Sequence, residues 1–273
     1  AKEYGFEIIS MPYKIGEKEI FPYKDFDVFD YKTFYYDLRH GTMPTTSALS
    51  PADYVAYFEP YFKAGKDVLY AHFSSAMSGT FNAMRLAEQT LKEKYPERKL
   101  YAIDTKGITM CGYTVAMEIA KMYKEGASVE ELLKWAETEV DKFAAYFFVT
   151  DLNFFRRSGR VKALAAIMGN IIGIKPIINM DGNGVMTPQC KVMGTQKAIA
   201  KLLEYVETLQ DHLKEHKVVI THSDALPLAE QLEAKLKEKY GADLQTEITI
   251  VNPTAGAHCG PDGVGICFHA IHR

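Results

Sequence analysis

Short apolar segments alternate with longer amphipathic ones between residues 67 and 143, and this alternation constrains the fold more than any other feature. The periodicity predicts strands at 67–73 and 99–105, and helices at 78–96, 108–126 and 128–143. Strands that alternate with helices of this length form βαβ units and a mainly parallel sheet. Ligands of such sheets bind at the carboxyl ends of the strands, where the chain turns into the next helix.

The remaining pattern predicts a second α/β domain with a mixed sheet, and we place the boundary near residue 144, giving domains 1–144 and 145–273. Before the alternating region we expect a strand at 7–10 and helices at 29–39 and 50–65, with Ser50 as N-cap of the latter. After residue 144 we expect a strand (AAYFFVTDL), a cation-rich turn (LNFFRRSGRV), a short apolar helix beginning at 161, strands around DGNG, a helix at 195–216, a strand at 218–222, a helix at 227–239, a strand at 246–252 and a closing loop (AHCGPDGVG).

Composition places the chain among soluble globular proteins. Of its 273 residues 47% are hydrophobic and 25% charged, and the net charge of −3 gives no reason to expect nucleic acid as a partner. No apolar run approaches the roughly 20 residues of a membrane span, and no signal peptide opens the sequence. The four cysteines lack close metal-ligand spacing, so we expect reduced thiols, a cytoplasmic location and no metal.

Two clusters of small hydroxyl residues, PTTSALSP (44–51) and SSAMSGT (74–80), each precede a predicted helix. Ser78 stands at the expected start of the helix 78–96, so its hydroxyl and the N–H groups of Gly79 and Thr80 could bind an anion there. Capping of the helix is the simpler interpretation of Ser78. Thr46 and Ser47 are not needed for the next helix start, which makes them better candidates for contact with a ligand.

Two later segments carry further candidates. In the glycine-rich segment 255–265, which includes Gly260, His258 can present its ring as a donor or as a cation. Three arginines crowd FFRRSGRV (154–161), among them Arg157 and Arg160, and could bind phosphate or an acidic partner. Each segment could equally be a solvated loop. Neither a dinucleotide fingerprint nor a Walker motif occurs, so nucleotide binding has little support.

Five motifs in order, TSALSP, SSAMSGTF, LNFFRRSGRV, GIKPIINMDG and HCGPDGVG, resemble the DegV family of bacterial fatty-acid-binding proteins, the FakB-type subunits of fatty acid kinase. The resemblance covers nearly the whole chain. It implies two α/β domains with a long-chain fatty acid between them and no other cofactor. It also implies a protein without catalytic activity, which presents the fatty-acid carboxylate to a separate ATP-dependent kinase, so that the acyl phosphate enters phospholipid synthesis.

The resemblance also assigns the site. It implies that the carboxylate is bound by Thr46, Ser78, Gly79 and His258, and the secondary candidates are Ser47, Thr80, Arg157, Arg160 and Gly260. Apolar segments such as MCGYTVAMEIAKM and VKALAAIMGNIIGI could line a tunnel for the acyl chain, with methionines that adapt to a flexible ligand.

The chain departs from the family pattern in three places. The numbered sequence begins past a strand that usually carries an Asp-Ser pair, so we expect the first sheet to lack that strand. Cys259 replaces a threonine and Asp262 looks inserted, which changes the loop around His258. Met193 stands where the family often has arginine, which bears on how a kinase would be engaged.

Two other functions remain open from the sequence. A serine acyl-hydrolase could use Ser78 as nucleophile, His258 as base, and Asp104 or Asp262 to orient it. The segment AMSGT lacks the glycine that a nucleophile elbow has two positions before the serine. Alternatively, the same fold could bind another amphipathic anion.

Overall fold

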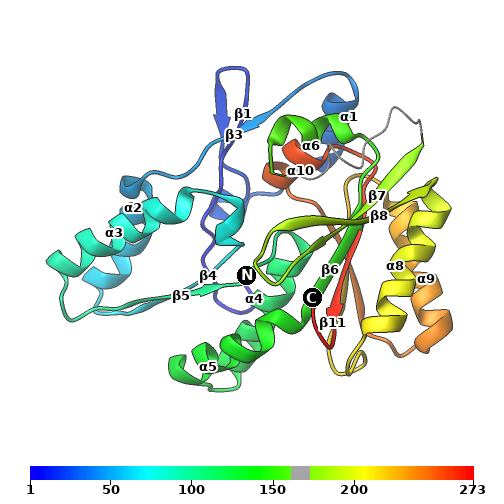
Figure 1. The fold of residues 1–273 in the computed structure, drawn as a ribbon. Coiled ribbons are helices and arrows are strands. Elements are labelled where there is room, and N and C mark those ends of the chain that lie inside the picture. Colours follow the sequence, from blue (N-terminus) through cyan, green and yellow to red (C-terminus); the bar gives the residue numbers. More distant parts are fainter. Residues whose placement is uncertain (161–172) are drawn as a thin grey trace.

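The computed structural model describes residues 1–160 and 173–273 of an α/β fold (Figure 1). Up to residue 142 the regular elements are β1 (Tyr13–Ile15), β2 (Lys18–Ile20), α1 (Tyr31–Arg39), β3 (Thr45–Thr46), α2 (Pro51–Lys63), β4 (Val68–His72), α3 (Thr80–Lys94), β5 (Leu100–Asp104), α4 (Met110–Lys124) and α5 (Val129–Glu139). The later elements are β6 (Phe143–Phe148), α6 (Leu152–Ser158), β7 (Ile174–Met180), β8 (Met186–Met193), α8 (Thr195–Leu209), β9 (Val218–His222), α9 (Leu226–Tyr240), β10 (Thr246–Ile250), α10 (Pro253–Cys259) and β11 (Val264–His269).

A six-stranded mixed sheet in the order β10-β9-β11-β6-β7-β8 forms the larger half of the molecule. Helices α8 and α9 pack on one face and α4 on the other (Figure 1). Alternate residues of β6 explain why both faces are covered: Ala144 and Tyr146 join the core under α8, whereas Phe143 and Phe147 join the core under α4. A sheet that is apolar on both faces must be buried on both.

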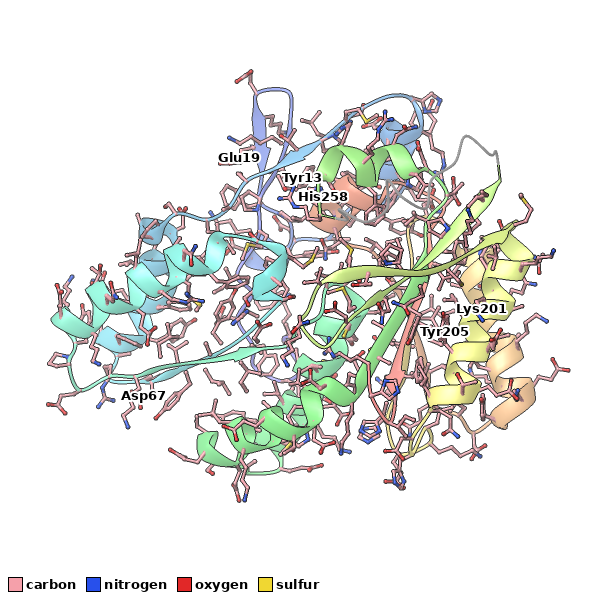
Figure 2. The ribbon with its side chains drawn as sticks, viewed as in Figure 1. Tyr13, Glu19, Asp67, Lys201, Tyr205 and His258 are labelled. Carbon is pink, nitrogen blue, oxygen red and sulfur yellow. The ribbon has the colours of Figure 1, made fainter. Side chains whose placement is uncertain are left out.

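The smaller half contains two separate sheets. Strands β4 and β5 pair in parallel, with α3 as the connection between them and α2 packed against α3. Strands β2, β1 and β3 form an antiparallel sheet, in which Tyr13 of β1 lies opposite Thr46 of β3. Figure 2 shows Tyr13 next to His258 in the view, where this sheet meets α10.

Most predicted elements are confirmed, including their caps. Ser50 and Ser128 each accept a hydrogen bond from the third residue of the helix they precede, at 3.2 and 3.3 Å, and both form capping boxes. The strands around DGNG are β7 and β8. Among the residues described, no helix combines the length and the apolar character that a membrane crossing requires.

Four local predictions were wrong. Residues 7–10 are extended but pair with no strand in the described ranges, and the helix expected to reach 216 ends at Leu209. The cation-rich turn contains α6, and the predicted closing loop contains the second half of α10. In both places a capping residue starts a short helix, Asp151 for α6 and Asn252 for α10. The short apolar helix expected from residue 161 lies outside the described residues.

The domain boundary near residue 144 stays a prediction. The six-stranded sheet begins with β6, close to that position. However, α4 precedes the boundary and covers a face of this later sheet through Met110 and Val115. The first half of the chain therefore supplies part of the core of the second.

Candidate functional site

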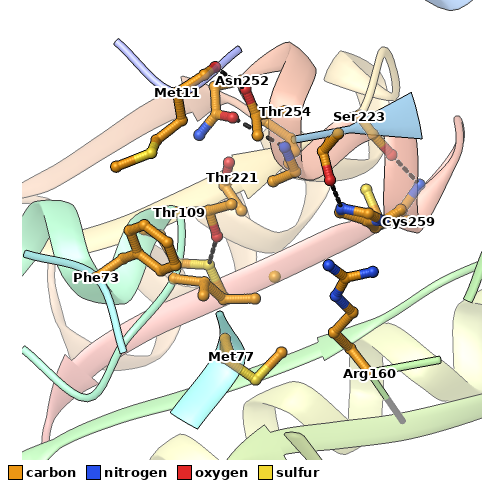
Figure 3. A pocket seen from close by; sticks show the side chains of 18 of the residues that line it. Met11, Phe73, Met77, Thr109, Arg160, Thr221, Ser223, Asn252, Thr254 and Cys259 are labelled. Atoms are coloured by element: carbon orange, nitrogen blue, oxygen red, sulfur yellow. Dashed lines mark hydrogen bonds between the residues drawn. The ribbon is translucent and has the colours of Figure 1, made fainter. Parts of the chain in front are cut away.

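An apolar cavity of about 340 Å³ lies where the two halves and the N-terminal segment meet (Figure 3). A cavity of this size is in the range that holds a small-molecule ligand. Its apolar walls come from distant parts of the chain: Ile8, Ile9, Met11, Phe73, Met77, Ile108, Met110, Phe147, Phe148, Val149, Phe155, Met186, Val251 and Val264. The interior therefore suits a hydrocarbon chain.

Five of the predicted site residues, Thr46, Ser47, Ser78, Arg160 and His258, line this cavity. They come from β3 and the residue after it, from the loop between β4 and α3, from the turn after α6 and from α10. The fold thus gathers segments that are far apart in the sequence around one opening.

Thr46 and His258 are in direct contact, with 2.9 Å between Thr46 Oγ1 and His258 Nε2. The two residues are 212 positions apart, so only the folded chain can bring them together. Helix α10 is held against α1 by close packing, because a Cβ at Gly256 would lie 2.7 Å from the hydroxyl of Tyr35. That contact fixes the helix whose last turn carries His258.

His258 is neutral in the free protein. Burial first, and then the charges of Arg160 and Arg157, lower the pKa of His258 to about 4. At neutral pH the ring therefore acts as a hydrogen-bond donor or acceptor, and its expected role as a cation does not apply before a ligand binds. A carboxylate placed beside it would favour the protonated form.

Ser78, Gly79 and Thr80 take different roles. The Ser78 hydroxyl accepts a hydrogen bond from the backbone N–H of Thr80 at 3.2 Å, so this N–H is not free for an anion. Gly79 is exposed at the start of α3 and nothing lies within 4 Å of its Cβ position. The Thr80 hydroxyl is buried against Leu49 N and Tyr54 Oη, and Thr80 does not line the cavity.

The two arginines also differ. Arg157 donates to the carbonyl of Pro44 at 3.3 Å and so braces the segment that leads into β3. The Arg160 guanidinium donates a hydrogen bond to the backbone carbonyl of Ser158 at 2.6 Å. Its side chain also lines the cavity (Figure 3). Among the described residues that line the cavity, Arg160 is the one with a cationic side chain.

Ser47 and Gly260 have structural partners. The Ser47 hydroxyl donates to Glu19 of β2 at 3.0 Å. Gly260 has φ +70°, and a Cβ there would lie 2.4 Å from the Phe154 ring, so the chain requires glycine at this turn. Gly260 thus allows the backbone after His258 to turn close to the Phe154 ring.

An open cleft of about 710 Å³ adjoins the cavity. Both are lined by Met77, Ser78, Arg160 and Met186. The cleft adds the exposed N-terminal end of α3, with Gly79 and Arg85. Ser78 thus lies between the apolar interior and a surface that a second molecule can approach.

The two carboxylates expected to orient His258 in a serine hydrolase, Asp104 and Asp262, are bonded to other groups. Asp104 accepts hydrogen bonds from the hydroxyl of Ser75 at 2.5 Å and from Lys106 N at 2.8 Å. Asp262 forms a 2.6 Å ion pair with Arg39. Within 1–160 and 173–273, neither carboxylate orients His258, so the geometry does not provide the triad.

Sequence reasoning missed a second group of polar residues in the cavity: Ser10, Thr109, Thr221, Ser223, Asn252 and Thr254. Three of them could have been found. Thr221, Ser223 and Asn252 lie at or directly after the carboxyl ends of predicted strands, where α/β sheets bind their ligands. Ser10 and Thr254 carry no comparable signal in the sequence.

Comparison with known proteins shows the family. The model of the DegV family, described as "Uncharacterised protein, DegV family", matches residues 1–270. A DegV domain-containing protein of Clostridium perfringens is 33% identical over 237 residues, which is 87% of this chain and 81% of the relative.

Solved structures share the whole fold. The crystal structure of DegV from Bacillus subtilis, described as a fatty acid binding protein, has a TM-score of 0.82 and 25% identity, and the match covers 98% of this chain and 93% of that one. A DegV family protein from Ruminococcus gnavus, refined with vaccenic acid, has a TM-score of 0.84 at 20% identity, covering 96% of this chain and 92% of that one. With a family match over 270 positions and these structural likenesses, the chain belongs to the DegV family.

Proposed function

We propose that this protein binds one long-chain fatty acid and presents its carboxylate to a separate ATP-dependent fatty acid kinase, which forms the acyl phosphate. The acyl chain lies in the apolar cavity. The carboxylate lies at Thr46, Ser78 and His258, which all line the cavity, and Ser78 also lines the open cleft.

The observation that carries the proposal is the Thr46–His258 contact at the polar side of an apolar cavity. Hydroxyls and a neutral imidazole bind a carboxylate through hydrogen bonds and leave it ionised, so that it stays a nucleophile for phosphate transfer. Burial of about fourteen methylenes at ~0.8 kcal/mol each supplies at most ~11 kcal/mol, before the cost of immobilising the chain. Hydrophobic burial therefore dominates affinity, and the polar groups fix the orientation.

Relatives support the ligand class. DegV from Bacillus subtilis, at 25% identity over nearly the whole chain, is described as a fatty acid binding protein. The Ser78 hydroxyl, the exposed Gly79 and the cation of Arg160 face the shared opening, where a phosphoryl donor can reach the carboxylate.

Kinase engagement is the finer part of the proposal. Met193, at the end of β8, is 50% exposed and stands where the family often has arginine. We therefore expect contact with a kinase to depend on the rim of the cleft, including Arg85 and Arg160, more than on this position.

The test begins with protein purified from bacterial cells, extracted with organic solvent and analysed by mass spectrometry. We expect one equivalent of a long-chain fatty acid, and Ser78→Ala should retain roughly tenfold less after dilution, because a hydrogen bond to a charged group is lost. Ser75→Ala is the matched control, since Ser75 lines the cleft but not the cavity. No co-purifying acid, together with no uptake of added acid, would contradict the proposal.

A second experiment addresses the kinase. Loaded protein, ATP and a bacterial fatty acid kinase subunit should yield acyl phosphate, trapped as the hydroxamate. Hydrolysis of a nitrophenyl ester that is abolished by Ser78→Ala would instead favour the acyl-hydrolase.

A further inference from the structure

The cavity contains a donor that a plain hydrocarbon chain cannot satisfy. Asn252 lines the cavity, and its side-chain oxygen accepts a hydrogen bond from Ala255 N at 2.9 Å as the N-cap of α10. Because the oxygen must face Ala255, the planar amide turns its NH₂ group the other way. Within the described ranges this nitrogen donates to no protein group, so two hydrogen-bond donors remain for a ligand.

Neighbouring side chains add acceptors around this amide. Thr221 is 4% exposed and donates its hydroxyl hydrogen to Thr249 O at 3.3 Å, and the Thr254 hydroxyl donates to Met11 O at 2.7 Å. With their hydrogens engaged, both hydroxyl oxygens are left as acceptors. The cavity wall at Asn252 thus offers donors and acceptors together.

This polar group is distinct from the one around the proposed carboxylate. Thr221 is in β9, and Asn252 follows β10, the strand that pairs with β9 in parallel. Figure 3 shows Asn252 and Thr221 across the pocket from Arg160. Asn252 caps the first turn of α10 and His258 lies in the last turn, so a ligand whose carboxylate lies at Thr46, Ser78 and His258 brings another part of its chain to Asn252.

We propose that the preferred ligand is a fatty acid that carries an oxygen on its acyl chain, as a hydroxyl or oxo group hydrogen-bonded to the amide of Asn252. This inference rests on the proposed function and names its substrate class. A methylene at that position would leave the amide without a partner, whereas a chain oxygen accepts from it. A site built to hydrogen-bond an oxygen discriminates strongly against the analogue that lacks it.

The experiment compares stearate with a positional series of hydroxystearates and oxostearates on delipidated protein, with dissociation constants measured by calorimetry. We expect one position to bind about tenfold more tightly than the others, the size of one hydrogen bond in a buried site. Asn252→Ser keeps the N-cap but removes the NH₂ group, so it should weaken that isomer roughly tenfold and change stearate by less than about twofold.

Two further variants sharpen the assignment. Asn252→Asp also caps α10 but offers only acceptors, so it should reject the oxo ligand and keep part of the affinity for the hydroxyl ligand. Asn153→Ser, at an exposed position of α6, is the matched control and should change nothing.

The outcomes separate the two proposals. If stearate binds and every oxygenated isomer binds more weakly, with no optimum and no dependence on Asn252, the inference is overturned and the proposed function stands. If neither stearate nor any isomer binds, both are overturned.

Discussion

The two parallel strand pairs, β4–β5 and β9–β10, both end at the cavity, yet their edges are built differently. At the first edge, Ser78 borders an open cleft and stands near Arg160. At the second edge, Thr221 and Asn252 line the cavity but not the open cleft, and the nearby Thr254 joins the N-terminal segment to this side through its bond to Met11 O. One edge is open and cationic, and the other is closed and neutral.

This difference shows how the carboxyl ends of two parallel strand pairs can bind two different parts of a long ligand. Carboxyl ends of parallel strands present polar groups wherever they occur. Exposure to solvent and the nearest charge then decide which group suits a carboxylate and which suits a neutral chain.

The largest expected effect comes from filling the closed side. Ala255→Phe should place a ring in the cavity and displace four or five methylenes of ligand, which at ~0.8 kcal/mol each weakens binding by more than about 100-fold. Dissociation constants for stearate measure this. Ala234→Phe, on the exposed face of α9, is the control. Unchanged affinity in Ala255→Phe would show that the acyl chain does not extend to this edge.

The next effect tests the burial of His258 in the cavity wall. His258 has a pKa of about 4, below its ordinary value of 6.5, so the unfolded chain takes up a proton below about pH 6.5 and the folded chain does not until about pH 4. The contribution of His258 to the free energy of unfolding is therefore complete above about pH 6.5 and decreases as the pH falls toward 4. Between pH 7 and pH 5 the free energy of unfolding should fall by about 2 kcal/mol through His258 alone.

Urea unfolding of delipidated protein at both pH values measures this, with His258→Gln for comparison. The variant should lose about 2 kcal/mol less than the parent over the interval. An identical pH dependence in parent and variant would mean that His258 is solvated, in contradiction to its burial in the structure.

A smaller effect concerns the contact between Thr46 and His258. Thr46→Val keeps the shape of the side chain and removes the hydroxyl, so stearate should bind roughly tenfold more weakly, since one hydrogen bond to the carboxylate is lost. Thr45→Val is the neighbouring control, because Thr45 lies on the same strand but outside the cavity. Equal losses in both variants would point to a strand effect instead.

The smallest effect addresses the closure of the second edge. Arg39 of α1 pairs with Asp224 and Asp262, each at 2.6 Å, and these residues flank the turns that carry Ser223 and Gly263 into the cavity. Partly exposed ion pairs contribute little, so Arg39→Met should lower the free energy of unfolding by about 1 kcal/mol. Thermal unfolding compared with Lys214→Met, which breaks an exposed pair with Asp243, checks this. A loss no larger than in Lys214→Met would mean that α1 does not hold these turns.

Much of the fold was predictable because its signals are local. The capping boxes at Ser50 and Ser128 and the apolar strands 68–72 and 100–104 are visible in a few neighbouring residues. Residues 7–10 look like a strand, but three of them, Ile8, Ile9 and Ser10, line the cavity, and the segment pairs with no described strand. The Asn252-Pro253 start of α10 was a readable signal, an N-cap followed by proline, that the glycine-rich sequence after it obscured.

The candidate site was predictable only in part. Thr46, Ser78 and His258 were found because they lie in motifs, and the structure brings them to one cavity. The burial that makes His258 neutral and the second role of Asn252 depend on packing between distant segments. No pattern in a single stretch of sequence records those contacts.

The walls of the cavity combine residues 8–11 with residues 252–265, so the order of synthesis decides when the cavity can form. During synthesis the early segment leaves the ribosome long before the late one, and folding proceeds from the first-made part of the chain. The cavity therefore lacks part of its walls until residues 252–265 have been synthesised. A fatty acid bound as we propose therefore enters after these residues have been made and folded.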